Sequence, residues 1–278
     1  MQSRTQRTAV SPGRLDPERS VVPRRQPLDR AALASQPPDG SAKRSTKRRI
    51  EDAALHLFAA RGFEATGIRD IADEAGLSTA ALYHYMGSKD ELLIDFMLVS
   101  MTQLTRVAQE ALAGAEGPAG ELACLVRVHV GFHALDSQRS LVADDELRAL
   151  SEEAFARVIR LRDNYEQLWA DILERGQRTG VFRLANARVT RLALLEMCNG
   201  VARWFSDKGP LTAAELADAF TDLALAMVSA HSNQRPLRRA DVTCPPTSDI
   251  LAIIERELRE FGEASASGPA KPASQGAA

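Results

Sequence analysis

The residues best suited to recognition chemistry lie on one short predicted helix, 79–85, and at the start of the helix after it. Ser78 comes before this helix as a good N-cap. Lys89 lies in the first turn of the next helix, where the helix dipole alone favours an acid, so a phosphate partner would explain it. The outward positions of 79–85 are short or aromatic and carry no carboxylate to repel phosphate. They are Thr79, Ala80, Tyr83 and His84.

A second pair of chemically capable residues is His129 and His133, four positions apart on a predicted helix, a spacing at which two imidazoles can share a metal ion. No third ligand follows at a fixed spacing, and Asp136 is the only acid near enough to consider. We therefore expect buried structural histidines, or histidines that line a pocket, and no metal ion or cofactor.

Catalysis has little support in the sequence. It lacks the P-loop, G-x-G-x-x-G, G-x-S-x-G and H-E-x-x-H motifs. Its three cysteines have no partner histidine nearby in sequence. The cysteines are Cys124, Cys198 and Cys244. We expect no enzyme, with an all-helical enzyme kept as one rival hypothesis.

Three short helical patterns in 46–93 would position the first set of residues. Apolar side chains recur at helical spacing in each pattern, and Gly62 and Gly76 end the first two. Two short helices joined by a tight glycine turn form a helix-turn-helix, whose second helix enters the DNA major groove. The inward residues are Ile50, Ala53, Ala54, Leu57 and Phe58, then Ile68, Ile71, Ala72 and Ala75, then Leu82, Tyr85 and Met86.

The blocks AALHLFAARGFEAT and IRDIADEAGLSTAALYHYMGSKDELL resemble the DNA-binding domain of the TetR family of bacterial transcriptional repressors. Met86 and Gly67 depart from the residues most usual there, Phe and Ser or Thr. The resemblance implies an all-α homodimer that binds a palindromic operator in double-stranded DNA. It also implies DNA contacts at Arg69, Thr79, Ala80, Tyr83, His84 and Lys89, beside the cap Ser78.

Composition divides the chain into four parts. Residues 1–42 are rich in Pro, Arg, Ser and Gln, which predicts a disordered basic arm or an inert extension. Residues 1–49 hold twelve Lys and Arg against four acids, in a chain of net charge −2. The N-terminal end is therefore basic and the rest of the chain is acidic. The helix-turn-helix domain then spans 43–93, a helical ligand-binding and dimerisation domain spans 94–232, and a linker, a possible short helix and a disordered tail fill 233–278.

Three widely spaced cysteines give no disulfide framework and no C-x-x-C metal spacing, which favours a reducing cytoplasm. The N-terminal region has no apolar run typical of a signal peptide, and no stretch is long and apolar enough to span a membrane. We therefore expect a cytoplasmic protein without a membrane partner.

After 93, helical periodicity continues and no period-2 strand pattern appears. Phe155, Val158, Leu161, Tyr165, Leu168 and Ile172 form the seam of the longest pattern. A turn is predicted at 136–139. The predicted helices are 89–113, 121–135, 141–150, 152–178, 186–206, 212–230 and 248–261.

The family resemblance implies that the helices between 89 and 206 surround a ligand cavity and that 186–206 and 212–230 form a four-helix dimer interface. An apolar face on the latter could equally be core within one chain. We expect a mostly apolar cavity and a small hydrophobic or amphipathic effector, an acyl-CoA or lipid-like compound being one candidate. The candidate lining residues are Phe96, Met97, Met101, His129, Phe132, His133, Asn164, Trp169 and Asn199.

The sequence leaves one further rival, a helical interaction protein that retains a helix-turn-helix without using it. DNA binding separates the two hypotheses.

Overall fold

The structure is a computed structural model that describes residues 41–264, with side chains from 46 to 260. These residues belong to one compact unit. Most of the predicted basic arm and the end of the predicted tail lie outside the described residues. The last two residues of the arm, Ser41 and Ala42, instead open the first helix.

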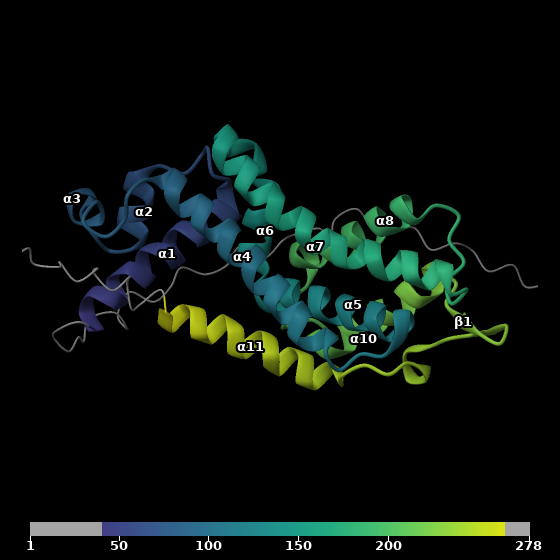
Figure 1. Cartoon of the computed structure of the whole chain (residues 1–278). Coiled ribbons are helices and arrows are strands. Elements are labelled where there is room, and N and C mark those ends of the chain that lie inside the picture. Colours follow the sequence, from purple (N-terminus) through teal and green to yellow (C-terminus); the bar gives the residue numbers. More distant parts are fainter. Residues whose placement is uncertain (1–40, 265–278) are drawn as a thin grey trace, which may run out of the picture. The chain divides into compact units, whose positions relative to one another are not determined.

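The described part of the chain is all-α, as predicted, except for one short hairpin (Figure 1). The hairpin was missed because each of its antiparallel strands has two residues, too few for an alternating pattern. In chain order the elements are α1 (Ser41–Arg61), α2 (Ile68–Glu74), α3 (Thr79–Leu82), α4 (Lys89–Leu112), α5 (Gly117–Leu135), α6 (Ser137–Asp145), η2 (Leu147–Ala149), α7 (Glu152–Arg178), α8 (Ala187–Asn199), α9 (Val201–Trp204), α10 (Ala213–Met227), β1 (His231–Ser232), β2 (Arg235–Pro236), η3 (Arg239–Asp241) and α11 (Thr247–Ala264).

The first three helices and the opening turns of α4 share one apolar core, and we call this part the reading head. Ile71 and Leu82 are completely buried, so α2 and α3 are fixed to the same platform. Phe58 of α1 meets Phe63 and Phe96 edge-on, with ring centroids 5.1 and 6.2 Å apart. The helical spacing in the sequence predicted the inward residues of α1, α2 and α3 on this platform, whereas Phe96 and Met97 of α4 were expected in the ligand cavity.

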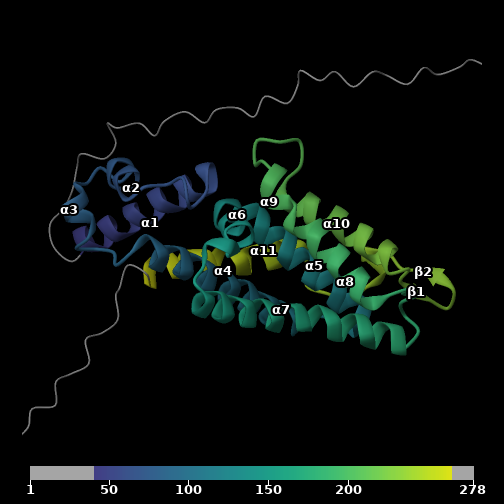
Figure 2. The ribbon, with the colours of Figure 1, turned by 90° about the horizontal axis from the view of Figure 1, so that it is seen from above.

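Helix α5 lies at the centre of the rest of the protein, and α4, α7, α8, α10 and α11 surround it (Figure 2). Leu122, Leu125, Val128 and Phe132 have no exposed surface. A helix that is apolar on every side is typical of a protein interior. The sequence placed its start too late, because Pro118 was interpreted as a break, whereas proline is favoured in the first turn of a helix.

Two predicted helix boundaries in the first half are wrong. Helix α3 stops at Leu82 rather than at 85, because the amides of His84 and Tyr85 bond to carbonyls three residues back, which tightens the chain before Gly87. The predicted turn at 136–139 belongs to α6. Its polar residues are compatible with a helix once Val142 is buried against the reading head.

Two further differences concern the second half. The predicted helix 186–206 is interrupted at Gly200, the residue with the highest helix cost after proline, and continues as α9. Phe155, expected in the seam of α7, is 43% exposed because it lies in the first turn, beyond the helices that cover Val158. Helix α7 as a whole has the predicted bounds, 152–178.

Helix α11 is longer than the possible short helix predicted near the C-terminus. Ile250 and Ile254 are buried completely against the central helices. Gly131 of α5 permits this contact, because a Cβ there would lie 2.7 Å from Leu251 and 2.9 Å from Ile254. None of the described helices is long and apolar enough to cross a membrane.

Candidate DNA-binding surface and central cavity

The turn between α2 and α3 has the geometry of a helix-turn-helix. Gly76 has φ +66°, a left-handed conformation that glycine adopts without strain, and Leu77 N donates to Ala72 O at 2.8 Å. Ser78 then caps α3, its hydroxyl accepting from Ala81 N at 3.1 Å. The Arg49 guanidinium donates to Ala75 O at the end of α2. These contacts fix the angle at which α3 projects.

The predicted DNA-contacting residues form one exposed surface on α2 and α3. Tyr83 is 57% exposed, and Arg69, Ser78, Ala80 and His84 are also exposed, while Thr79 is half-buried. Among the described residues Arg69 has no ion-pair partner. The structure thus brings together an aromatic ring, an imidazole and an unpaired guanidinium on the face that a DNA groove would meet.

Lys89 differs from this group, because its ammonium already has partners within the reading head. It donates to Phe63 O at 2.9 Å and Thr66 O at 3.1 Å, and it lies 3.9 Å from the centre of the Phe63 ring. These contacts explain a basic residue in the first turn of α4 without a phosphate. Lys89 ties the loop after α1 to the start of α4.

A cavity of about 90 Å³ lies between α4, α5, α6, α7 and α8, and we call it the central cavity. Met101, His129, His133 and Asn199 line it as predicted. The remaining lining residues are Ser100, Leu104, Ser140, Ala143, Asp144, Arg162, Tyr165, Glu166, Leu192, Leu195 and Glu196.

Hydrogen bonds fix His129 at the wall of this cavity. Its Nε2 lies 2.8 Å from Asn199 Oδ1, and its Nδ1 lies 3.1 Å from the Tyr165 hydroxyl. Because an amide oxygen only accepts, His129 Nε2 carries the proton and Nδ1 accepts from the tyrosine. Burial, and then the neighbouring His133, lower the pKa of His129 to about 3, so the ring is neutral. Burial raises the pKa of Tyr165.

His133 connects this pair to a half-buried charge on α6. Its ring stacks on His129, with centroids 4.3 Å apart, and its Nδ1 donates to His129 O at 3.0 Å. Its Nε2 lies 3.5 Å from Asp144 Oδ2, and Arg162 donates to Asp144 Oδ1 at 3.0 Å. Burial alone would raise the pKa of Asp144, but the hydrogen bond from His133 and the positive charge of Arg162 outweigh it, and the pKa is lowered. Asp144 is therefore an anion held between two donors.

Five predicted ligand residues are placed elsewhere. Phe96 and Met97 lie in the core of the reading head, because the first turns of α4 pack against α1. Phe132 is enclosed in the core around α5. Trp169 is completely buried beside His129, 5.9 Å between ring centroids, without lining the cavity, and Asn164 is exposed on α7.

The cavity lining is mixed: ten of its fifteen residues have polar or charged side chains, although apolar atoms form the larger share of the wall surface. Sequence reasoning missed Asp144, Arg162 and Tyr165. A usable signal was present on α7, where Arg162, Tyr165 and Glu166 follow one another at helical spacing beside Trp169. Polar residues on the inward face of an amphipathic helix mark a satisfied polar site.

Helices α8 to α10 carry most of the large apolar side chains that remain exposed. Leu223 is 54% exposed and Val189 is 60% exposed. Phe220, which lies within the helix 212–230 predicted at the dimer interface, is 9% exposed and packs near Trp204 of the same chain, 6.3 Å between ring centroids. The exposed members of this surface, which we call the α8–α10 face, are Val189, Leu192, Trp204, Leu211, Leu223 and Met227.

The fold and the exposed surface of α2 and α3 define a helix-turn-helix protein. Its second part is a helical domain that surrounds the central cavity. Residues 50–96 match the family described as bacterial regulatory proteins, tetR family, and residues 115–228 match the tetracyclin repressor-like C-terminal domain. The chain belongs to the TetR family of DNA-binding transcriptional regulators.

Known proteins agree with this assignment. The HTH-type transcriptional repressor KstR2 of Rhodococcus jostii (strain RHA1) is 30% identical over 191 residues, which cover 67% of this chain and 93% of the relative. The TetR family transcriptional regulator PfmR of Thermus thermophilus is 36% identical, with a TM-score of 0.58 over 64% of this chain and 97% of that one. AibR, solved with isovaleryl coenzyme A and operator DNA, shares the fold at 22% identity, with a TM-score of 0.58 over 64% of this chain and 97% of that one.

Proposed function

We propose that the protein is an effector-responsive transcriptional repressor that binds a palindromic operator as a homodimer. The observation that carries this proposal is the double role of α6. Asp144 of α6 lines the central cavity, and two residues later Glu146 accepts a hydrogen bond at 3.0 Å from Phe63 N in the reading head. One short segment thus joins the cavity to the part that would meet DNA.

The DNA contacts follow from the exposed face of the helix-turn-helix. Helix α3 would enter the major groove, with α2 bracing against the backbone. We assign Lys89 an indirect role in this interface, because it positions the loop after α1 and the start of α4. The residues assigned to direct contact are Arg69, Ser78, Thr79, Ala80, Tyr83 and His84.

The dimer would form through the α8–α10 face. An exposed apolar surface on a soluble domain commonly marks an interaction site. Covering it with the same face of a second copy would hold two reading heads for two half-sites of one operator. Leu223 and Met227 lie one helical turn apart on α10 and would be central to that contact.

The effector would bind in the central cavity. Its mixed wall favours the amphipathic form of the expected ligand, with a polar group near Asn199 and Arg162 and an apolar part beside Met101 and Leu104. The structure of AibR with isovaleryl coenzyme A makes acyl-CoA compounds the first class to test. A ligand that displaced Asp144 from its two donors would move α6 and shift the population towards a state with lower DNA affinity.

The test begins with sequencing the genomic DNA that co-purifies with the protein, followed by fluorescence anisotropy on the recovered site. Wild-type protein should bind one palindrome, and acyl-CoA compounds should raise its melting temperature and release the DNA. A Tyr83→Ala/His84→Ala double variant should weaken binding by about tenfold or more without changing the melting temperature, since both residues are exposed.

Phe155→Ala is the matched control, because it also removes an exposed aromatic ring but lies on α7. No enriched DNA from the wild-type protein would support the rival interaction protein. A wild-type affinity that survived the double variant would remove α3 from the DNA interface.

A further inference from the structure

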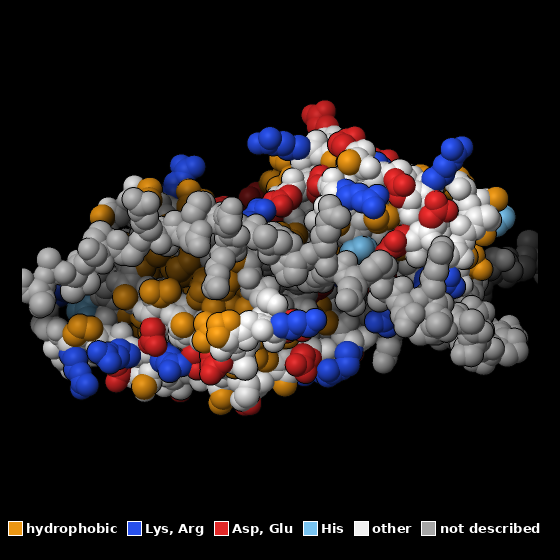
Figure 3. Space-filling view, turned by 180° about the vertical axis from the view of Figure 1, so that it is seen from behind, with side chains coloured by type: hydrophobic (Ala, Val, Ile, Leu, Met, Phe, Trp, Pro, Cys, Tyr) orange, Lys and Arg blue, Asp and Glu red, His pale blue; other side chains and the backbone are white. Residues whose placement is uncertain are grey.

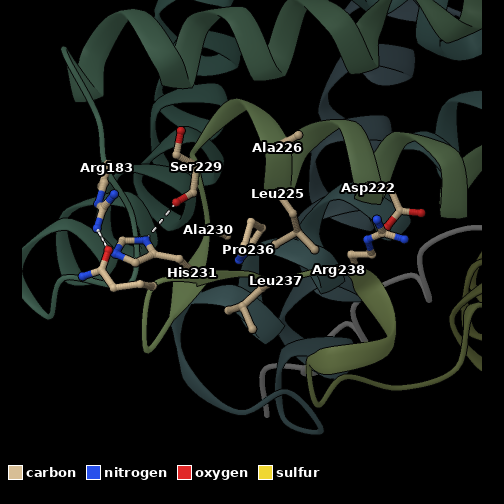
Figure 4. A pocket seen from close by; sticks show the side chains of 11 residues that line it. Arg183, Asp222, Leu225, Ala226, Ser229, Ala230, His231, Pro236, Leu237 and Arg238 are labelled. Atoms are coloured by element: carbon tan, nitrogen blue, oxygen red, sulfur yellow. Dashed lines mark hydrogen bonds between the residues drawn. The ribbon is translucent and has the colours of Figure 1, made fainter.

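A larger hollow, of about 610 Å³, lies beyond the end of α10, and we call it the hairpin groove (Figure 4). Its walls come from the last turns of α10, the β1–β2 hairpin, the segment 237–238 and Arg183. None of its lining residues lines the central cavity. Most of the wall also follows residue 228, where the match to the C-terminal family domain ends. Seven of its eleven lining residues therefore lie outside the matched domain.

Backbone hydrogen bonds hold the walls of the groove in place. His231 N donates to Val181 O at 2.9 Å, Leu237 N donates to Ala230 O at 2.8 Å, and Arg183 N donates to Val228 O at 3.0 Å. The hairpin is thereby closed at its base and tied to the α7–α8 loop, and that loop is tied to the end of α10. A fixed wall needs little ordering when a ligand binds, which favours affinity.

The groove has an apolar middle and two charged ends, as Figure 4 shows. Leu225, Pro236 and Leu237 lie between them. At one end Arg183 donates to Gln234 Oε1 at 2.5 Å, which leaves the amide NH₂ group of Gln234 as a second donor. At the other end Arg238 lies beside Asp222.

The uncompensated charge of this groove is positive. Asp222 is already paired with Arg239, whose Nε lies 3.2 Å from Oδ2 and whose backbone N lies 3.2 Å from Oδ1. Among the described residues, neither Arg183 nor Arg238 forms an ion pair. An anion that reached Arg183 would meet a guanidinium with no competing carboxylate.

We propose that the hairpin groove binds an amphipathic monoanion, with an alkyl chain over Leu225, Pro236 and Leu237 and a carboxylate or phosphate head on Arg183. Arg183 is the head-group end because the Gln234 amide adds a donor there, whereas the Asp222 carboxylate weakens the field around Arg238. Guanidinium groups bind carboxylate and phosphate through paired N–H donors, and a short apolar floor orients the chain. This site stands independently of the operator and of the effector in the central cavity.

Isothermal titration calorimetry of the full chain tests the proposal with octanoate, octyl phosphate, 1-octanol and inorganic phosphate, each below its aggregation concentration. One or both of the octyl anions should bind, and the tighter of the two identifies the head group. Octanol and phosphate alone should bind at least about tenfold more weakly, because each lacks half of the interaction. Arg183→Gln should weaken the anion by about tenfold or more, as expected for a lost charged hydrogen bond.

Arg235→Gln is the matched control, since Arg235 is an exposed arginine of the same hairpin that does not line the groove. It should change the affinity by less than about twofold, as should Asn199→Leu in the central cavity. Equal losses in Arg183→Gln and Arg235→Gln, or loss of binding in Asn199→Leu, would overturn the assignment. Binding that appears only in a monomeric Leu223→Asp variant would show that a second copy covers the groove, and would overturn it as well.

Discussion

The reading head and the helical domain differ in where their polar residues lie. In the reading head the core is apolar and the recognition residues are exposed, Tyr83 at 57%. In the helical domain the polar residues are interior, and Tyr165 is 2% exposed and bonded to His129. A surface group can be replaced at little cost in folding, whereas a buried network must be satisfied as a whole. Function and stability are thus separable in the first region and coupled in the second.

The two regions can also be compared by their charged side chains. On the face seen in Figure 3, acidic and basic side chains of the described residues are interspersed, with no broad area of one sign. In the helical domain the half-buried charges of Asp144 and Arg162 compensate one another locally.

The largest expected effect comes from separating two copies of the protein. Leu223→Asp places a charge on the α8–α10 face, where burial against a partner would leave it without a counter-charge. We expect folded monomers by light scattering and circular dichroism, with operator affinity lower by about 10²–10⁴-fold, because two linked heads bind far more tightly than one.

Leu135→Asp is the control for that experiment, as Leu135 is another exposed leucine, at 39%, outside the α8–α10 face. A normal dimer mass for Leu223→Asp would exclude this face as the interface. Phe220→Asp is unsuitable for the purpose, since it would introduce a charge into the core of its own chain.

The buried His129 ring predicts a pH dependence of the stability that arises in the helical domain. Below pH 6.5 the unfolded chain protonates His129, whereas the folded protein keeps it neutral down to a pKa of about 3. The unfolded state therefore binds more protons as the pH falls, and the stability present above pH 6.5 is lost towards pH 3. Between pH 6.5 and 5 the loss from this residue is about 2 kcal/mol.

Chemical denaturation at several pH values measures this loss. His129→Gln should flatten the dependence, because the amide does not titrate. Equal slopes for wild type and His129→Gln would contradict the buried neutral ring.

The reading head could be predicted from the sequence because its determinants are local. The apolar spacing of Phe58, Ile71 and Leu82, the glycine turn and the caps Ser78 and Ser88 each act within a few residues. Glu91 completes a capping box with Ser88, as the spacing indicates. Local signals of this kind can be recognised in consecutive residues without knowing which helices pack against one another.

The central cavity could be predicted only in part because its contacts are not local. Helix α4 contributes to two cores, and periodicity cannot tell that Phe96 and Met97 face the reading head while Met101 faces the cavity. Arg162 and Asp144 are 18 positions apart on different helices, so no spacing rule joins them. The His129–His133 spacing was visible, but its role depended on Asn199, 70 positions away from His129.

The smallest expected effect distinguishes the two roles considered for Lys89. Its ammonium bonds to two carbonyls of the reading head, so Lys89→Ala should lower the free energy of unfolding by about 1 kcal/mol and leave the salt dependence of operator binding unchanged. Arg69→Ala is the counterpart, because Arg69 is exposed and has no ion pair among the described residues. Its loss should lower the salt slope by about one unit without affecting the melting temperature, as expected for one phosphate contact. If Lys89→Ala instead lowered the salt slope at an unchanged melting temperature, Lys89 would contact the phosphate backbone as Arg69 is expected to. Lys89 would then count among the exposed DNA contacts of the reading head and not among the residues that support its fold.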